Sequence, residues 1–260
     1  MSDSKEMSFW DHLDELRAVL IKIAVVVVAV TMGLFFVMPT VFDAVIMAPT
    51  RGDFILYRVF ERVAGAIPFA PPFKAETFHV DVISIKLASQ FFIHISTSFW
   101  LGLVVSFPVI LYFLWRFIAP ALYEGERRGT RIAFSLATVM FYLGAAVGYF
   151  VVFPVTLRFL ADYHVSASIA NQISIDSYID TFMMLIFVMG LVFELPLLSW
   201  SLSAIGVLRR SFFATYRRHA IVALLILAAL ITPTGDPFTL MIVFLPIYLL
   251  YEASALLVKK

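Results

Sequence analysis

Acidic side chains stand at two points where this chain enters or leaves an apolar run, and the first is the stretch HLDELRAVLIK at 12–22. It comes directly before the apolar run IAVVVVAVTMGLFFVM. On a helix turning about 100° per residue, Asp11, Asp14 and Glu15 share one face, opposite a row of apolar side chains. These carboxylates therefore face water or a partner together, and they are candidate ligands for a cationic group.

Two interpretations of this first group of acids remain open from the pattern. In one, the segment is an interfacial helix with solvated acids, and Asp14 pairs locally with Arg17 or Lys22. Anionic lipid on an inner leaflet repels carboxylates, so an interfacial helix there normally shows a basic polar face instead. In the other interpretation, the acids bind a cationic partner.

The second group of acids lies in WRFIAPALYEGERR at 115–128, where an Ala-Pro pair ends one apolar run and a glycine turns the chain. Bases follow Glu124 and Glu126 closely, so one interpretation is local neutralisation, which contributes little where solvent-exposed. The other interpretation places one of these carboxylates beside the first group. One surface would then offer two separated acids to a cationic ligand.

A single carboxylate falls inside an apolar run, at Glu194 in GLVFELPLLSW. An ionisable group at membrane depth is costly when it faces lipid, so we expect it to face a wet cavity or a polar partner, or to be protonated. Pro196 lacks a backbone donor, which predicts a kink and a free carbonyl near Val192. Glu194 is thus either a functional residue or a side chain bonded within the bundle.

Nothing in the sequence indicates a metal site or an enzyme. His94 has no second histidine or carboxylate at i+3 or i+4, and the chain has no cysteine. No nucleophile elbow, phosphate-binding loop or HExxH motif is present, so no catalytic residue or cofactor is expected. A formal net charge of +1 gives no polycationic surface for nucleic acid.

Composition places these residues in a membrane protein. Of 260 residues, 62% are apolar and 14% are charged, against roughly a quarter charged in soluble domains. Runs that approach the roughly 20 residues needed to cross a bilayer predict an all-α, polytopic fold with six transmembrane helices, in a single domain over 1–260. Prolines in these runs predict bent helices and hence a curved, concave wall. The six predicted spans are 19–38, 92–115, 131–153, 181–203, 217–232 and 238–258.

The last two predicted spans are separated only by TPTGDP, which predicts a helical hairpin. The apolar part of the fifth span, from Ala220 to Ile231, covers about 18 Å, so the hairpin is expected to be thinner than the bilayer. The external loop 39–91 contains PFAPPF and the alternating stretch FHVDVISIK. A cap of short helices or strands is expected there.

The placement of Lys and Arg predicts the orientation. With the N-terminus inside, thirteen bases lie in inner segments and six in outer ones, which favours both termini in the cytoplasm and a multi-pass protein of the inner (cytoplasmic) membrane. The acidic N-terminal region gives no indication of a signal peptide. The inner bases are Lys5, Arg17, Lys22, Arg116, Arg127, Arg128, Arg131, Arg209, Arg210, Arg217, Arg218, Lys259 and Lys260; the outer ones are Arg51, Arg58, Arg62, Lys74, Lys86 and Arg158.

Together, these motifs resemble one family, TatC, the polytopic subunit of the twin-arginine protein translocase. The matching motifs run over nearly the whole chain, and their order and spacing agree with six spans. They are HLDELR before the first span, AP at 48–49, FPVILYFLWRFIAPALYEGERR at 107–128, FYLGAAVGYFVVFP at 141–154, FELP at 193–196, and ITPTGDPF followed by LPIYLLYE.

The resemblance implies a function. Members of this family bind signal peptides that carry consecutive arginines, and the carboxylates at the matching positions here are Glu15 and Glu126. Two fixed carboxylates on separate elements can clamp two adjacent guanidiniums, which pair bidentately with carboxylate. The resemblance also implies single-span partners of the TatA and TatB kind and drive by the proton-motive force. The supporting positions that it implies are Arg17, Pro49, Phe117, Arg127, Glu194 and Asp236.

Two points stay open at the level of sequence. The segment from about Arg51 to His79 is longer than is usual between the family's motifs, so it either caps the cavity or meets a partner outside. An alternative function from a different class is a proton-coupled small-solute transporter that uses Glu194 as its proton site. Self-association of the chain is a further open possibility.

Overall fold

The computed structural model describes residues 9–66, 78–119, 124–166, 168, 171–204, 206–232 and 235–258. Within these residues the chain is almost entirely helical, which confirms the all-α prediction. The long helices are α1 (Phe9–Val41), α3 (Ser89–Ile118), α4 (Glu124–Val147), α6 (Ile175–Val192), α9 (Arg217–Ile231) and α10 (Pro237–Leu257). The shorter elements are η1 (Phe42–Ile46), η2 (Ala48–Thr50), α2 (Ile55–Ala66), β1 (Val82–Ile83), η4 (Gly148–Val152), α5 (Phe153–Asp162), β2 (Ile173–Ser174), α7 (Leu195–Ala204) and α8 (Arg210–Thr215).

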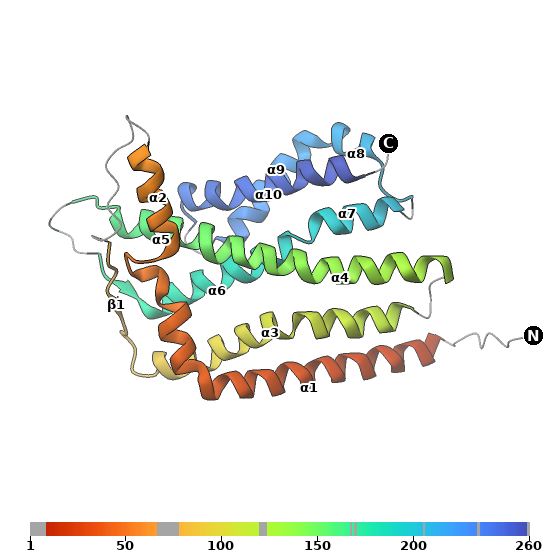
Figure 1. Cartoon of the computed structure of the whole chain (residues 1–260), viewed down its shortest axis with the longest axis horizontal. Coiled ribbons are helices and arrows are strands. Elements are labelled where there is room, and N and C mark those ends of the chain that lie inside the picture. The colour runs from red at the N-terminus through yellow and green to blue at the C-terminus, as the bar shows by residue number, and fades with distance from the viewer. Residues whose placement is uncertain are drawn as a thin grey trace, which may run out of the picture.

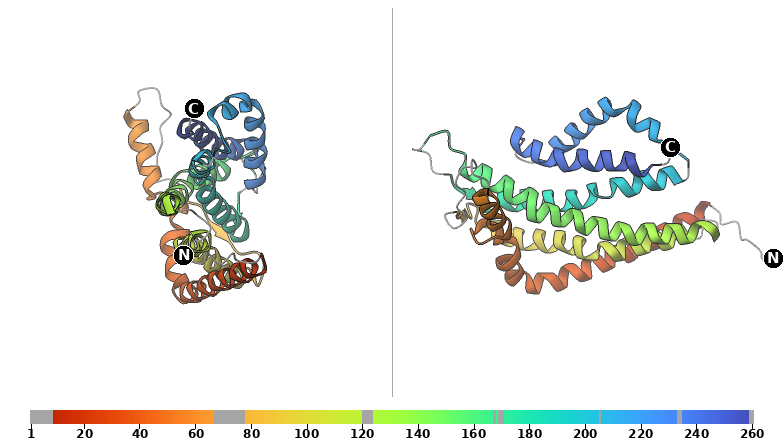
Figure 2. Two further views of the ribbon diagram at one scale, coloured as in Figure 1. Left: turned by 90° about the vertical axis from the view of Figure 1, so that its right-hand side faces the viewer. Right: turned by 45° about the horizontal axis from the view of Figure 1, so that its top comes forward.

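The long helices lie side by side in an open row (Figures 1 and 2). In this row α1 packs on α3, α3 packs on α4 and α6, and α4 packs on α6, while α10 joins α7 to α9. The helices α1 and α9 occupy opposite ends of the row (Figure 2). The arrangement is therefore a wall with two faces, as expected for a protein that offers a surface to a ligand along its length.

The two ends of the long helices differ in structure. The start of α1 and the end of α10 lie at one end, which we call the termini end (Figure 1). The end of α3 and the start of α4 are also at the termini end (Figure 1). At the opposite end, here named the capped end, lie η1, η2, α2 and the two-stranded parallel sheet of β1 and β2 (Figure 1). The cap of short helices or strands expected for residues 39–91 is present there, although α1 continues past Pro39 to Val41 and α3 already begins at Ser89.

Five helical stretches are long and apolar enough to cross a membrane, among the residues that the structure describes. They overlap five of the six predicted spans almost completely, although the third begins at Ile132 and the last ends at Leu257. The first and third stretches extend well beyond their predictions because π or 3-10 turns continue the apolar run. The remaining predicted span, 217–232, is α9, whose 15 residues rise about 22 Å. It packs against α10 as the predicted hairpin. The five stretches are His12–Thr50, Ser89–Ile118, Ile132–Asp162, Ile175–Ser203 and Pro237–Leu257.

Small residues allow α4 and α6 to approach closely. A Cβ on Gly148 would lie 2.9 Å from the Cα of Ile186, and a Cβ on Gly190 would lie 2.7 Å from the ring of Phe141. Such contacts are shorter than real Cβ atoms adopt, so a side chain would push α6 away from η4 at Gly148 and would displace the ring of Phe141 at Gly190. This is the packing expected between membrane helices, where small residues replace hydrophobic collapse as the means of association.

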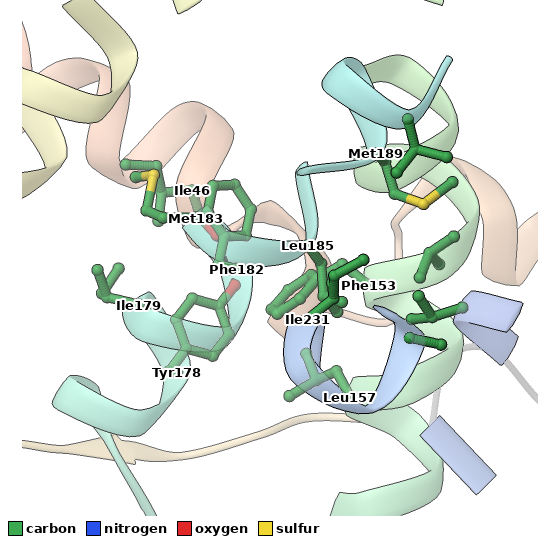
Figure 3. Close-up of a cluster of buried hydrophobic side chains, with 14 of the residues drawn as sticks. Ile46, Phe153, Leu157, Tyr178, Ile179, Phe182, Met183, Leu185, Met189 and Ile231 are labelled. Atoms are coloured by element: carbon green, nitrogen blue, oxygen red, sulfur yellow. Dashed lines mark hydrogen bonds between the residues drawn. The ribbon is translucent and has the colours of Figure 1, made fainter. Parts of the chain in front are cut away.

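The largest cluster of buried side chains lies in the half of the long helices that is nearest the capped end. Aromatic rings from two elements meet there: Phe153 is 4.9 Å from Phe182 and 5.2 Å from Tyr178, between ring centroids. Both pairs are edge-to-face, the favourable arrangement for aromatic rings. Figure 3 shows these rings with their aliphatic neighbours, among them Ile46, Leu157, Ile179, Met183, Leu185 and Ile231.

Three tyrosine hydroxyls hold the turns that follow α1. The end of a helix leaves backbone carbonyls without partners, and these must be satisfied in a membrane. Tyr178 donates to the carbonyl of Ile46 at 2.5 Å, and Tyr149 donates to the carbonyl of Val45 at 2.9 Å. The third, Tyr57, donates to the carbonyl of Pro49 at 2.9 Å. The turns that follow α1 are thus joined to α2, η4 and α6 by hydrogen bonds.

Candidate functional site

Glu15 lies on the side of α1 that faces α3, at the termini end. One turn before it, the ring of His12 stacks on Phe117 near the end of α3, with 4.5 Å between centroids. One turn after it, Val19 is only 7% exposed. Since i−3, i and i+4 share one side of a helix, Glu15 is directed toward the same neighbour. Leu13 and Leu20, on the other side, are exposed as lipid-facing residues would be.

The carboxylate of Glu15 makes no ion pair with any of the side chains that the structure describes. The same holds for Asp14 and Arg17, so the local pairing of Asp14 with Arg17 or Lys22 is not formed among these side chains. Glu15 is half-buried. A half-buried, unpaired anion beside a second helix is well placed to accept a cationic ligand.

Glu126 and Arg127 lie in the first turn of α4, which begins at Glu124. Their backbone is at the termini end, as is Glu15 (Figure 1). Their side chains lie outside the described set, so the separation between the Glu15 and Glu126 carboxylates stays a prediction. The stacking of His12 on Phe117 holds the start of α1 beside the last turn of α3, the helix that precedes α4 in the chain.

Glu194 stands at a break between two helices. Here α6 ends at Val192 and α7 begins at Leu195, with Pro196 in its first turn, as predicted. Because the stretch runs from Ile175 to Ser203, the break lies close to its middle, slightly toward the termini end. One carboxylate oxygen of Glu194 is buried and has no hydrogen-bond partner within the described residues. This oxygen is a polar atom poised toward the helix bundle rather than toward lipid.

Close packing holds this break against α4. A Cβ on Gly144 would lie 2.4 Å from the carbonyl oxygen of Met189 and 2.7 Å from the Cβ of Phe193. The backbone of α4 therefore touches the residues that lead into Glu194. The amides around the break remain bonded, with Glu194 N–H donating to Leu191 O at 3.0 Å. The position of the carboxylate is set by backbone contacts, which are less mobile than side-chain contacts.

The supporting positions divide between the two ends of the molecule. Arg17 and Phe117 are at the termini end with Glu15, whereas Pro49 and Asp236 are at the capped end (Figure 1). The carboxylate of Asp236 accepts the backbone N–H of Thr239 at 2.7 Å and so caps the N-terminus of α10. Both capped-end residues have structural contacts and lie too far away to touch a ligand bound at Glu15.

No cluster of metal-ligating side chains occurs in the part of the chain that the structure describes. His94 is engaged with α1 instead: its Nε2 is 2.8 Å from the carbonyl of Phe35, and its ring stacks on Phe35 at 4.1 Å. His12 is the residue that sequence reasoning missed. Its position one turn before Glu15, inside HLDELR, was the available signal.

Comparisons with known proteins agree with this arrangement. A profile of the family described as "Sec-independent protein translocase protein (TatC)" matches residues 11–246. The Sec-independent protein translocase protein TatC of Blattabacterium sp. subsp. Periplaneta americana is 33% identical over 254 residues, which are 97% of this chain and 95% of that one. The protein of the same name from Deinococcus radiodurans is 32% identical over 248 residues, 95% of this chain and 84% of that one.

A solved structure matches the fold as well. It is the crystal structure of the twin-arginine translocase receptor TatC, with a TM-score of 0.74 and 31% identity, covering 95% of this chain and 97% of that one. A second crystal structure of the receptor, in DDM, has a TM-score of 0.74 and 30% identity. The alternative of a small-solute transporter receives no support from these matches. By sequence along nearly its whole length and by fold, this chain belongs to the TatC family of Sec-independent protein translocase proteins.

Proposed function

We propose that this chain is the core receptor subunit of a twin-arginine translocase, and that Glu15 and Glu126 bind the paired arginines of a signal peptide at the termini end. One observation carries the proposal. Glu15 is half-buried on the side of α1 that faces α3, has no ion-pair partner within the described side chains, and shares the termini end with the first turn of α4.

The chemistry of the two groups supports arginine as the ligand. A guanidinium is planar, always charged and weakly hydrated, and it pairs bidentately with a carboxylate. A lysine ammonium forms no such fork and is more strongly hydrated. Hydrogen bonds to charged groups contribute about 1.5–3 kcal/mol each in a partly solvated site. Two carboxylates on separate helices would therefore favour an Arg-Arg pair over Lys-Lys.

The break at Glu194 supports a second part of the site. A signal peptide continues from its arginines into an apolar segment, which would lie along the wall toward α6 and α7. The buried carboxylate oxygen of Glu194 lacks a partner within the described residues. A buried polar atom of this kind is stabilised by a hydrogen-bond donor, and an incoming polypeptide carries such donors along its backbone.

The same proposal includes location and partners. The excess of bases in the segments at the termini end favours both termini in the cytoplasm, in an inner (cytoplasmic) membrane. The partners would be single-span subunits of the TatA and TatB kind, folded cargo with a twin-arginine signal, and further copies of this chain. The family resemblance implies transport driven by the proton-motive force, and the lack of a recognisable nucleotide-binding motif in the sequence is consistent with this.

Site-specific crosslinking tests the clamp. A photoreactive residue is placed in a signal peptide directly beside its Arg-Arg or Lys-Lys pair, and the peptide is offered to the full-length protein in membranes with both carboxylates intact. The crosslinks to the chain around positions 15 and 126 are then mapped. Both positions are expected to crosslink to the Arg-Arg peptide and much less to the Lys-Lys peptide. Equal crosslinking of the two peptides, or none from either position, would refute the proposal.

Neutralising variants give the matched control. Glu15→Ala and Glu126→Ala are each expected to weaken binding of the Arg-Arg peptide at least about tenfold, the equivalent of the lower limit for a charged hydrogen bond. Asp14→Ala removes an exposed acid from the adjacent position of α1 and is expected to leave binding nearly unchanged. Export of a folded reporter behind an Arg-Arg signal should follow the same order. An equal loss from Asp14→Ala would indicate a general charge effect instead.

A further inference from the structure

The helix α2 runs across the long helices rather than along them. In two views at right angles, α2 stands upright while the long helices lie horizontally or point at the viewer (Figures 1 and 2). In the end-on view it projects beyond the row on one side (Figure 2). With the long helices crossing a bilayer, α2 would lie parallel to the membrane surface at the capped end, above lipid that borders the row.

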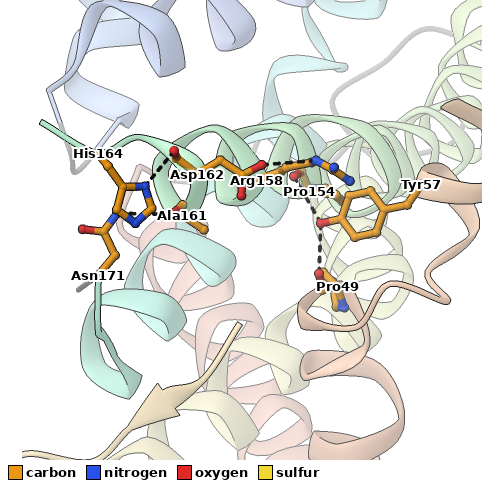
Figure 4. Close-up of polar contacts among 8 residues, drawn as sticks. All are labelled: Pro49, Tyr57, Pro154, Arg158, Ala161, Asp162, His164 and Asn171. Carbon is orange, nitrogen blue, oxygen red and sulfur yellow. Dashed lines mark hydrogen bonds and ion pairs between the residues drawn. The ribbon is translucent and has the colours of Figure 1, made fainter. Parts of the chain in front are cut away.

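One face of α2 is fixed to the protein. Tyr57 is fully buried and donates from its hydroxyl to the carbonyls of Pro49 at 2.9 Å and Pro154 at 3.3 Å (Figure 4). The guanidinium of Arg158 lies 5.6 Å from the centre of its ring. Burial raises the pKa of Tyr57, so the hydroxyl stays a donor. Just before α2, the ring of Phe54 packs at 6.1 Å on Phe150. The orientation of the helix about its own axis is thereby set.

Apolar side chains stand on another face of α2, away from the protein. Ile55 is 58% exposed and Val59 is 45% exposed. The two are four residues apart and therefore lie one above the other on the helix. Within the described residues, nothing covers them. Exposed apolar side chains on a helix that lies in the membrane plane are typical of an interfacial helix, whose apolar face enters the boundary between headgroups and acyl chains.

Basic side chains line an open cavity next to this apolar face. Arg58 and Arg62, also four residues apart, line a cavity of about 710 Å³ together with Arg51. Neither Arg58 nor Arg62 forms an ion pair with a described side chain. Arg51 is held in place by donating from its guanidinium to the carbonyl of Asp43. The other charged or titratable residues that line the cavity are Asp53, Glu61 and His79, and His79 pairs with Asp81 at 3.3 Å.

We propose that α2 is a membrane-surface helix whose arginines bind anionic phospholipid headgroups at the capped end. Two features indicate a phospholipid as the ligand: the charge of the cavity and the depth in the membrane of the apolar side chains beside it. Three guanidiniums exceed two carboxylates in the cavity, and arginine pairs bidentately with phosphate. The adjacent apolar residues Ile55 and Val59 would reach the acyl boundary of the same lipid layer. A soluble acidic protein would satisfy the arginines and leave these apolar side chains in water.

Lipid quenching tests this proposal on the full-length protein. Since the chain has no cysteine, Val59→Cys or His164→Cys provides a unique site for a fluorescent label, and His164 does not line the cavity. The labelled proteins are reconstituted in phosphatidylcholine vesicles that contain phosphatidylglycerol, with a spin label on the acyl chains of one lipid or the other. The label at 59 is expected to be quenched by spin-labelled lipid and shielded from aqueous iodide, and the label at the exposed position 164 is expected to show the reverse.

The arginines are tested by charge removal. Spin-labelled phosphatidylglycerol is expected to quench the label at 59 more strongly than spin-labelled phosphatidylcholine. Arg58→Gln with Arg62→Gln should reduce this preference about 20- to 30-fold, because each base near an anionic surface accounts for about a fivefold change in affinity. The matched control, Arg209→Gln with Arg210→Gln, removes two exposed arginines from the termini end and should leave the preference unchanged.

Three results would overturn the proposal. The first is iodide access at 59 equal to that at 164, which would place α2 in water. The second is a preference for phosphatidylglycerol that survives the loss of Arg58 and Arg62. The third is loss of the preference on adding inorganic phosphate while 59 remains open to iodide, which would identify a site for free phosphate. None of these results bears on Glu15 or Glu126, so they leave the proposed receptor function untouched.

Discussion

Replacing Gly144 by alanine tests whether the close approach of α4 and α6 holds the helix break at Glu194 in place. A Cβ at this position would lie 2.4 Å from the carbonyl oxygen of Met189 and 2.7 Å from the Cβ of Phe193. The first of these atoms belongs to the backbone, and the second is attached directly to it. Neither can swing away as the end of a long side chain would, so the two helices must move apart.

The expected magnitude follows from two opposing effects. Inserting a methyl group into close packing costs about 1–3 kcal/mol. Exchanging glycine for alanine in a helix interior stabilises the folded protein by about 0.5–1 kcal/mol. The difference is a net destabilisation on the order of 1–2 kcal/mol for Gly144→Ala. Gly33 in α1 is the matched control, because a Cβ there would meet nothing within 4 Å. Gly33→Ala is expected to stabilise the protein by about 0.5–1 kcal/mol.

Unfolding of the purified protein in detergent micelles, followed by circular dichroism during denaturant titration, provides the assay. The expected order of stability is Gly33→Ala, then the unchanged protein, then Gly144→Ala. Binding of an Arg-Arg signal peptide should also weaken in Gly144→Ala, because the break at Glu194 moves with α6. If Gly144→Ala is as stable as Gly33→Ala, the backbone contact between α4 and α6 is not as described, and the reasoning fails.

Three further predictions each concern the substitution of a single residue. Tyr178→Phe should destabilise the protein by about 1–2 kcal/mol, since it leaves the carbonyl of Ile46 without this donor; an unchanged denaturation midpoint would contradict this. Asp236→Ala should cost about 0.5–2 kcal/mol through loss of the bond from Thr239, whereas Asp236→Asn, which keeps an accepting oxygen, should be nearly neutral in the same titration. Glu15→Ala should leave stability unchanged while peptide binding falls; a parallel loss of both would indicate a structural role.

Much of the fold could be predicted because its signals are local. Apolar runs that approach the length needed to cross a bilayer predicted the helices, and Pro196 predicted the break beside Glu194. Helix ends were less predictable. The first helix continues through Pro39 and then through a turn of π-helix, because tyrosines distant in sequence satisfy the carbonyls released there. No pattern within residues 39–91 could indicate those partners.

In the candidate site, too, some features could be predicted from local sequence and others could not. The acids of HLDELR and of the second group stood out by their position beside apolar runs, and the family resemblance selected Glu15 and Glu126 from among them. The position of His12 within HLDELR was visible in the sequence, but its stacking partner Phe117, on another helix, was not. Contacts of this kind depend on how two helices pack.

By itself, the sequence determined that this protein is a wall of membrane helices with carboxylates near one end, since hydropathy and charge act on each segment separately. Only the tertiary structure decided which carboxylates remain unpaired, how closely α4 approaches Glu194, and that α2 lies across the other helices. Those features depend on contacts between segments far apart in the chain, such as the hydroxyl of Tyr57 with the carbonyl of Pro154. Such contacts form only when the whole row has assembled, because each supplies a partner that its own segment lacks.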